Sequence, residues 1–322
     1  MDIASHLAFG SALSALDRER RLGPGAGAAL MIGSIVPDID AVVAFVSGMD
    51  VYLELHQTGT HTLVTAAVQA IVLAGGLSVL VAGARFWRLA GAAFVAILGH
   101  FWWDLLSGST MQLLAPMSAW RLSWPIVAMA DPWIVAPLVV AVVVGWWRPR
   151  VRYRAAIAAL VVTTTVVAIH VIARERSLAA FEQFAQASTR QPASWQAEPV
   201  WASFDRWRIH ARLDSQLGTW IVTAFSRSAP TLLFTPGPPA DTAAVDASRG
   251  VPIVKRFLGF ADFPFAEVEQ EGAEHRVLWS DLKFCGPVRC DLRFGVAFGA
   301  GRAPLYEIVW IGKLRFVRPI VR

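Results

Sequence analysis

Long stretches without charged side chains constrain this chain more than any other feature of its sequence. Thr62–Ala84 contains no Asp, Glu, Lys or Arg, and Phe86–Leu106 contains only Arg88 and Asp104. A membrane-spanning helix needs about 20 predominantly apolar residues, so both stretches are long enough to cross a bilayer. With 55% hydrophobic and 16% charged residues, the whole chain is also too apolar for an ordinary soluble protein. We therefore predict an α-helical polytopic membrane domain of about five to six helices.

Further apolar runs complete this domain. The first run is too short to span a bilayer squarely, which predicts a short or interfacial helix. The second run is interrupted by Pro37-Asp38-Ile39-Asp40, which places a carboxylate pair inside a membrane helix. In chain order the runs are Ile3–Leu16, Gly23–Val36 with its continuation Ala41–Val46, Thr62–Ala84, Phe86–Leu106, Pro132–Trp147 and Ala155–Ala173.

Arginine residues fall on alternate connections between these runs. They are Arg18, Arg20 and Arg21, then Arg85 and Arg88, then Arg148, Arg150, Arg152 and Arg154. The positive-inside rule places such connections in the cytoplasm, so the other connections are expected outside. Membrane orientation explains much of the net charge of +5, so we expect no nucleic-acid partner. The first residues carry no basic region, which does not favour a cleaved signal peptide.

The composition changes after the last apolar run. Arg174–Gln191 predicts an amphipathic helix leaving the membrane, and Thr235–Gly250 predicts a loop. We predict three parts: a membrane helical domain at 1–175, a connecting helix or linker at 176–205, and a small β-rich extracytoplasmic domain at 206–322. The expected strands are Trp207–Leu213, Thr219–Phe225, Thr231–Phe234, Arg276–Phe284, Cys290–Phe298 and Leu305–Phe316.

Two cysteines, Cys285 and Cys290, flank a short Gly-Pro-Val-Arg segment in the predicted β-rich domain. Outside the cytoplasm a disulfide can persist between them. Two free buried thiols are an equally valid interpretation of the sequence alone. A zinc site built on these two residues is not expected, because no second Cys pair lies nearby.

Ionisable side chains of the metal-ligand type are expected at one depth near the outer side of the membrane domain. His100 and Asp104 are four residues apart and therefore share one face of a helix. Ionisable groups inside membrane segments are costly and usually functional, which favours a metal site over a purely structural polar network. The predicted ligands are His6, Asp38, Asp40, His61, His100 and Asp104. This mixture of imidazole and carboxylate suits one or two divalent ions, zinc first, with manganese or iron as alternatives.

Several of these residues carry a resemblance to a known family. The chain resembles the membrane-bound metal-dependent hydrolases typified by LexA-regulated inner-membrane proteins. The matching residues are His6, Pro37-Asp38-Ile39-Asp40, Thr60-His61, Gly99-His100-Phe101-Trp102-Trp103-Asp104, Leu114-Ala115-Pro116-Met117-Ser118 and Asp131-Pro132. The family usually has His-Arg-Gly before its Thr-His pair, whereas this chain has His56-Gln57-Thr58-Gly59. A longer branch carries a β-rich extension, which Val277–Leu282 resembles in part.

A more distant similarity is to zinc-dependent phospholipase C. That pattern also has an early His, a Pro-Asp after an apolar helix, a Thr-His pair and a His-x-x-x-Asp. The similarity implies a phosphodiester or a phospholipid headgroup as substrate.

The resulting functional expectation is a metal-dependent hydrolase at the outer face of the cytoplasmic membrane, acting on an ester or phosphoester of a membrane lipid or lipid-linked substrate. Asp40, His56 and Asp131 are the candidate catalytic residues, and Glu54 is a further candidate for acid or base chemistry. The alternative is a non-enzymatic metal-binding membrane protein, or a transporter, with a partner-binding β domain. The chain contains neither a His-Glu-x-x-His nor a Gly-x-Ser-x-Gly motif.

Overall fold

The computed structural model describes residues 2–17, 21–40, 59–188, 192–214, 216–271, 274–286, 288–299 and 303–320. These residues form two compact units. The first comprises the described parts of 1–48, 54–175 and 198–206, and the second those of 176–197 and 207–322. The connection predicted at 176–205 is therefore divided between the two units.

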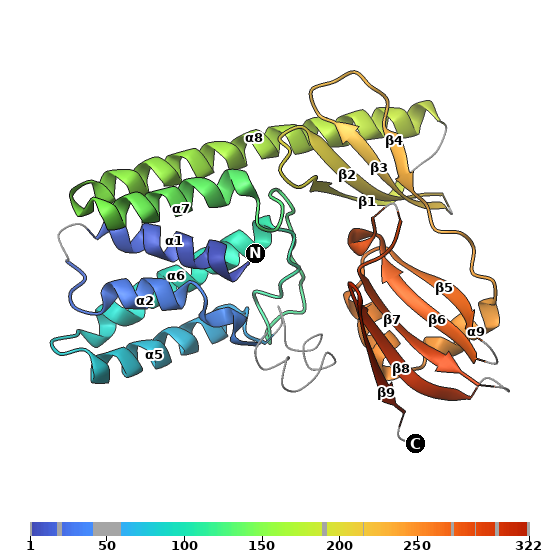
Figure 1. Ribbon diagram of the computed structural model, residues 1–322, viewed down its shortest axis with the longest axis horizontal. Coiled ribbons are helices and arrows are strands. Elements are labelled where there is room, and N and C mark those ends of the chain that lie inside the picture. Colours follow the sequence, from blue (N-terminus) through green and yellow to red (C-terminus); the bar gives the residue numbers. More distant parts are fainter. Residues whose placement is uncertain are drawn as a thin grey trace. The chain divides into compact units, whose positions relative to one another are not determined.

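The first unit is built from helices. They are α1 (Ile3–Leu16), α2 (Ala26–Gly33), the short 3-10 helix η1 (Val36–Asp38), α5 (Leu63–Leu80), α6 (Phe86–Leu106), α7 (Pro132–Trp147), the 3-10 turn η2 (Pro149–Val151) and the first part of α8 (Arg152–Ala187). Helix α1 contacts α2, α6 and α7, while α2 contacts α5 and α6. The α5–α6 pair and the α7–α8 pair thus enclose α1 and α2 (Figure 1).

Three helical segments among the described residues are long and apolar enough to cross a membrane: Leu63–Leu80, Phe86–Leu106 and Pro149–Ala187. Helices α1 and α7 are apolar but shorter. The sequence predicted separate helices at Ala155–Ala173 and Arg174–Gln191, whereas the structure joins them in α8. Because no Gly or Pro interrupts Arg152–Ala187, the charged residues near Arg174 are not enough to end the helix.

The ends of the helices sort into two sets (Figure 1). The α5–α6 turn, the α7–α8 turn, the end of α1 and the start of α2 lie at one end of the unit. The starts of α1, α5 and α7 and the ends of α2 and α6 lie at the other end. The turn before α6, with Arg85 and Arg88, and the turn between α7 and α8, with Arg148–Arg154, therefore share one end of the unit.

Small residues let the central helices approach closely. A Cβ atom built on Gly33 would lie 2.9 Å from the carbonyl oxygen of Ala93 and 3.1 Å from Cβ of Ala96. A Cβ atom on Gly10 would collide with Ser34. Such small-residue contacts are the common way for membrane helices to bring their backbones together.

The second unit contains two β-sheets. The strands are β1 (Pro192–Pro199), β2 (Arg206–Leu213), β3 (Gln216–Thr223), β4 (Thr231–Phe234), β5 (Pro264–Glu271), β6 (Glu274–Asp281), β7 (Leu292–Phe298), β8 (Pro304–Ile311) and β9 (Leu314–Pro319). One sheet has the order β1-β2-β3-β4 and the other the order β5-β6-β7-β8-β9. Helices α9 (Thr242–Ser248) and α10 (Pro252–Phe260) pack apolar side chains against the second sheet around Phe257, Trp279 and Phe294.

Besides the unpredicted strands β1 and β5, two details of this unit differ from the prediction. Leu305–Phe316 was expected to be one strand but forms the hairpin β8–β9, which turns at Gly312, where φ is +59°. Glycine adopts this left-handed conformation readily, which explains the turn. The predicted loop Thr235–Gly250 contains α9, whose first turn is capped by the carboxylate of Asp241.

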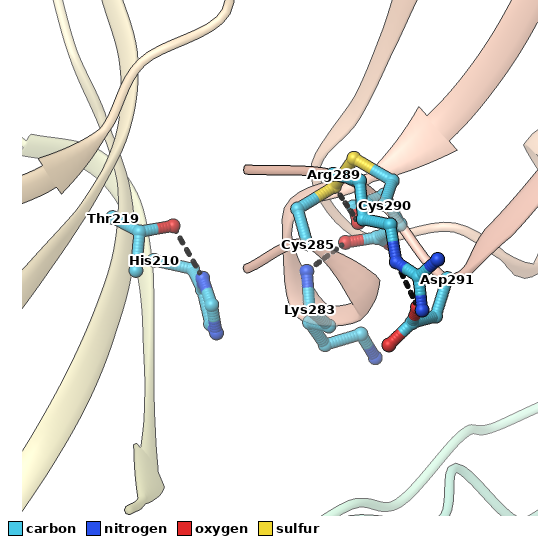
Figure 2. Close-up of a disulfide and its surroundings, with 8 residues drawn as sticks. His210, Thr219, Lys283, Cys285, Arg289, Cys290 and Asp291 are labelled. Atoms are coloured by element: carbon cyan, nitrogen blue, oxygen red, sulfur yellow. Dashed lines mark hydrogen bonds and ion pairs between the residues drawn. A yellow bond between two sulfur atoms is a disulfide. The ribbon is translucent and has the colours of Figure 1, made fainter. Parts of the chain in front are cut away.

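The two cysteines form a disulfide next to β7 (Figure 2). Both residues are buried with Phe263, Phe265 and Leu282. Of the two interpretations that the sequence allowed, the structure has the disulfide.

The contacts of Gly33 predict the effect of adding one methyl group there. Gly33→Ala is expected to destabilise the protein by about 1–3 kcal/mol, because the new Cβ must displace the backbone of α6. Gly76→Ala is the matched control, since no heavy atom lies within 4 Å of a Cβ at that position of α5. Thermal unfolding in detergent measures both variants. Equal unfolding temperatures for the two variants would contradict the close α2–α6 packing.

Candidate metal centre

Four ionisable side chains come together in the first unit. Asp38, His61, His100 and Asp104 each offer one ligand atom, and these atoms all lie within 4.8 Å of one another. They come from three places: the end of η1, the residue before the N-cap of α5, and the last two turns of α6. All four residues are buried. Segments far apart in the sequence thus meet at the end of the unit opposite to the basic turns (Figure 1).

The local sequence explains how two of these side chains are placed. Pro37 lies at the start of η1, where its fixed φ and missing N–H are tolerated, and Asp38 ends that turn. Thr62 caps α5 through a reciprocal pair of hydrogen bonds with Thr65. His61 therefore leads directly into a well-fixed helix start.

The two histidines of the cluster face each other through their Nε2 atoms. Nδ1–H of His100 donates to the backbone carbonyl of Ser34 at 2.8 Å. Because a carbonyl only accepts, a neutral His100 keeps its proton on Nδ1 and its lone pair on Nε2. The Nε2 atoms of His61 and His100 lie 3.1 Å apart.

A relay behind His61 fixes the tautomer of this second imidazole. The hydroxyl of Thr60 lies 2.5 Å from Oδ2 of Asp40 and 2.8 Å from Nδ1 of His61. Since a carboxylate only accepts, Thr60 donates its one hydrogen to Asp40 and accepts the N–H of His61. Asp40 lies 3.6 Å from Nδ1 of His61. Its observed contacts are therefore with the Nδ1 side of the ring, where a carboxylate helps to orient the imidazole.

The carboxylates complete the cluster. Oδ2 of Asp104 lies 3.2 Å from Nε2 of His100 and 3.4 Å from Nε2 of His61. Oδ1 of Asp38 lies 3.5 Å and 3.8 Å from the same two nitrogens. Both carboxylates thus approach the point where the two lone pairs face each other.

This arrangement fits a metal ion. Two lone pairs at 3.1 Å repel each other unless a proton or a cation lies between them. Neighbouring ligands at about 2.0–2.1 Å from a zinc ion are roughly 3 Å apart, which matches this spacing. Two carboxylates buried in a membrane segment add a strong electrostatic demand for a cation. The donor set of two imidazoles and two carboxylates suits zinc, and also manganese or iron.

His6 approaches the cluster from the opposite side of Asp104. Its Nε2 atom lies 3.0 Å from Oδ1 of Asp104, and its ring stacks on His100 with a centroid distance of 3.8 Å. Its Nδ1 atom is buried and has no hydrogen-bond partner among the described residues. In this geometry His6 orients Asp104 through Nε2. The Nδ1 atom of His6 is the ring nitrogen that remains for a further donor or acceptor.

The other predicted catalytic residues lie elsewhere. Asp131 caps α7 by accepting from the backbone N–H of Trp133 at 3.0 Å, and its Oδ2 lies 4.0 Å from Nδ1 of His170. His170 also donates to the carbonyl of Ile126 at 3.0 Å. His56 and Glu54 lie outside the described residues. Two groups that orient the histidines were not predicted. The Thr60 hydroxyl could have been found from its position next to His61 in the sequence. The Ser34 carbonyl could not, because every residue has a backbone carbonyl.

Comparison with known proteins identifies the family. A family model described as YdjM inner membrane protein matches residues 1–176. The chain belongs to this family. The family match agrees with the apolar helices and confirms the predicted inner-membrane class. All four cluster residues lie inside the matched region, while almost all of the second unit lies outside it. No curated protein and no solved structure matches the chain.

The cluster predicts the metal content of variants. Protein purified in detergent is expected to retain a divalent ion, and His100→Ala or Asp104→Asn is expected to lose most of it, because each change removes a donor atom. His170→Ala is the control, since this buried histidine contacts Asp131, Ile126 and Phe204 and is not one of the four cluster residues. Elemental analysis of the purified proteins measures the ion. Wild-type protein without stoichiometric metal would contradict the assignment.

The relay through Thr60 predicts a graded effect. Thr60→Val keeps the shape but removes the hydroxyl, and metal affinity is expected to fall about 10- to 100-fold, as for other groups that orient metal ligands. Thr60→Ser keeps the hydroxyl and is expected to retain most of the affinity. Competition with a chelator of known affinity measures the three proteins. Equal affinities for Val and Ser would show that the hydroxyl does not orient His61.

Proposed function

We propose that this protein is a metal-dependent hydrolase that acts on an ester or phosphoester of a membrane lipid or lipid-linked substrate. The observation that carries the proposal is the convergence of Asp38, His61, His100 and Asp104 within 4.8 Å. When bound, a divalent ion supplies Lewis-acid chemistry and makes hydroxide available at neutral pH, since it lowers the pKa of its water to about 7.

The residues of the chain divide into those that hold the ion and those that orient the ligands. Nε2 of His61, Nε2 of His100 and the carboxylates of Asp38 and Asp104 provide one complete set of four ligands. Ser34 and the Thr60–Asp40 relay hold the protons on the far nitrogens of the two histidines. A second ion would draw on His6 and Asp40, the remaining predicted ligands.

Access to the site is proposed on the side of Asp38. The side chain of Asp38 is 10% exposed, compared with 3% for Asp104 and 0% for both histidines. The neighbouring Ile39 is exposed and apolar, which suits an amphiphilic substrate better than a small soluble one. Of the candidate catalytic residues, Asp40 is the one beside this cluster, where its carboxylate accepts from the Thr60 hydroxyl and so helps to orient His61.

The site is proposed to open at the outer face of the cytoplasmic membrane. The arginine-bearing turns of α5–α6 and α7–α8 lie at the opposite end of the first unit, and positive charge favours the cytoplasmic side. The disulfide of the second unit supports an extracytoplasmic location for that unit, because disulfides persist in oxidising compartments.

Hydrolysis by purified protein tests this proposal. Zinc-loaded protein is expected to cleave phospholipids in mixed micelles, or bis-(p-nitrophenyl) phosphate as a generic phosphodiester. Chelation is expected to abolish turnover and zinc to restore it. Asp104→Asn is expected to lower turnover by at least about 100-fold, while His170→Ala retains it. Stoichiometric metal without turnover of either substrate would contradict the hydrolase and favour the non-enzymatic metal-binding alternative.

A further inference from the structure

The turn between α7 and α8 is densely basic. Arg148, Arg150, Arg152 and Arg154 occur within seven residues, and all four side chains are exposed. None of the four forms an ion pair with a described residue. The sequence contains no Asp or Glu between Asp131 and Glu175, so α7, the turn and most of the spanning part of α8 carry no internal counter-charge. Four like charges this close repel one another unless anions from outside the chain compensate them.

Exposed tryptophans border the same turn. Trp146 and Trp147, the last residues of α7, are 79% and 74% exposed. Tryptophan is enriched at the level of lipid headgroups, where its ring is apolar and its N–H is polar. The turn therefore combines a headgroup-level aromatic pair with cations immediately beyond it.

A second basic turn lies at the same end of the helical unit (Figure 1). Arg85 and Arg88 flank Trp87, which is 77% exposed. Arg88 also donates to the backbone carbonyl of Arg21 at 2.7 Å, which ties the start of α6 to the residues before α2. The pattern of arginine beside exposed tryptophan thus occurs twice on one end of the unit.

Packing fixes part of this surface in place. A Cβ atom on Gly145 would lie 2.9 Å from Cγ of Arg152, so the absence of a side chain on α7 leaves room for the stem of this arginine. The stem of Arg152 therefore lies against α7. A guanidinium group is a planar fork that binds phosphate oxygens in pairs.

We propose that the basic turn Trp146–Arg154 is a binding site for the phosphate headgroups of anionic phospholipids. The site lies at the opposite end of the unit from the metal centre and does not depend on hydrolase activity. The positive-inside rule concerns orientation during insertion and requires no bound lipid, whereas this site retains anionic lipid in the folded protein. Each arginine near an anionic surface contributes about a fivefold increase in affinity.

Native mass spectrometry of the full-length protein tests the site. Delipidated protein in detergent is titrated with phosphatidylglycerol or phosphatidylcholine. Wild type is expected to retain phosphatidylglycerol preferentially, and replacement of Arg148, Arg150, Arg152 and Arg154 by Gln is expected to weaken this binding by at least about 25-fold. Replacement of the same four residues by Lys keeps the charge and is expected to retain most of the preference. Arg121→Gln, which removes one exposed arginine from the α6–α7 connection, is expected to leave it unchanged.

Three results would overturn the proposal. They are equal binding of the two lipids by wild type, unchanged phosphatidylglycerol binding by the Gln variant, and full displacement of the lipid by inorganic phosphate, which would make the turn a site for free anions. The metal content of each variant serves as the folding control, because the ligands lie at the other end of the helices. Measurement in detergent also separates lipid binding from any change in insertion orientation, since both ends of the protein are accessible.

Discussion

Repulsion between two imidazole lone pairs is the constraint on which the helical unit depends. The 3.1 Å between the Nε2 atoms of His61 and His100 is stable only with a positive charge between them. The surrounding carboxylates of Asp38 and Asp104 impose the same requirement, because isolated charges are costly within a membrane. A cation bound here, as proposed for this cluster, would join the helices that carry these groups at this end, while apolar packing holds them along their length.

The polar side chains can meet because glycine residues let the backbones of α1, α2 and α6 approach closely. Gly33 brings α2 against Ala93 and Ala96 of α6, and a Cβ on Gly99 would lie 2.5 Å from the ring of Phe9 on α1. Larger residues at these positions would move α1 and α2 away from α6 by a side-chain layer. His6 stacks on His100 at 3.8 Å, a distance that leaves no room for such a shift. The geometry of the polar cluster thus depends on the close helix contacts at these glycines.

Some of this was predictable from sequence. The four-residue spacing of His100 and Asp104 indicated a shared helix face, and the alternating arginines indicated which helix ends lie together. The Ser34 carbonyl was not predictable, because every residue has one and only the fold selects it. Strands β1 and β5 were missed because residues such as Glu267 and Glu269 make their pattern polar, and pairing with neighbouring strands outweighs that composition. Helix α8 was divided because local charge was given more weight than the absence of a helix breaker.

The length and the packing of helix α8 limit which insertions and deletions it can accept. Its 36 residues measure about 54 Å, whereas the hydrocarbon layer of a bilayer is about 30 Å thick, so the helix is longer than one crossing requires. Phe181 packs on Trp220 near its far end, which fixes one face of the helix to β3. In a helix, height and rotation are linked, since each residue adds about 1.5 Å and about 100°. Insertions or deletions in α8 that keep Phe181 facing Trp220 must therefore come in multiples close to a whole turn.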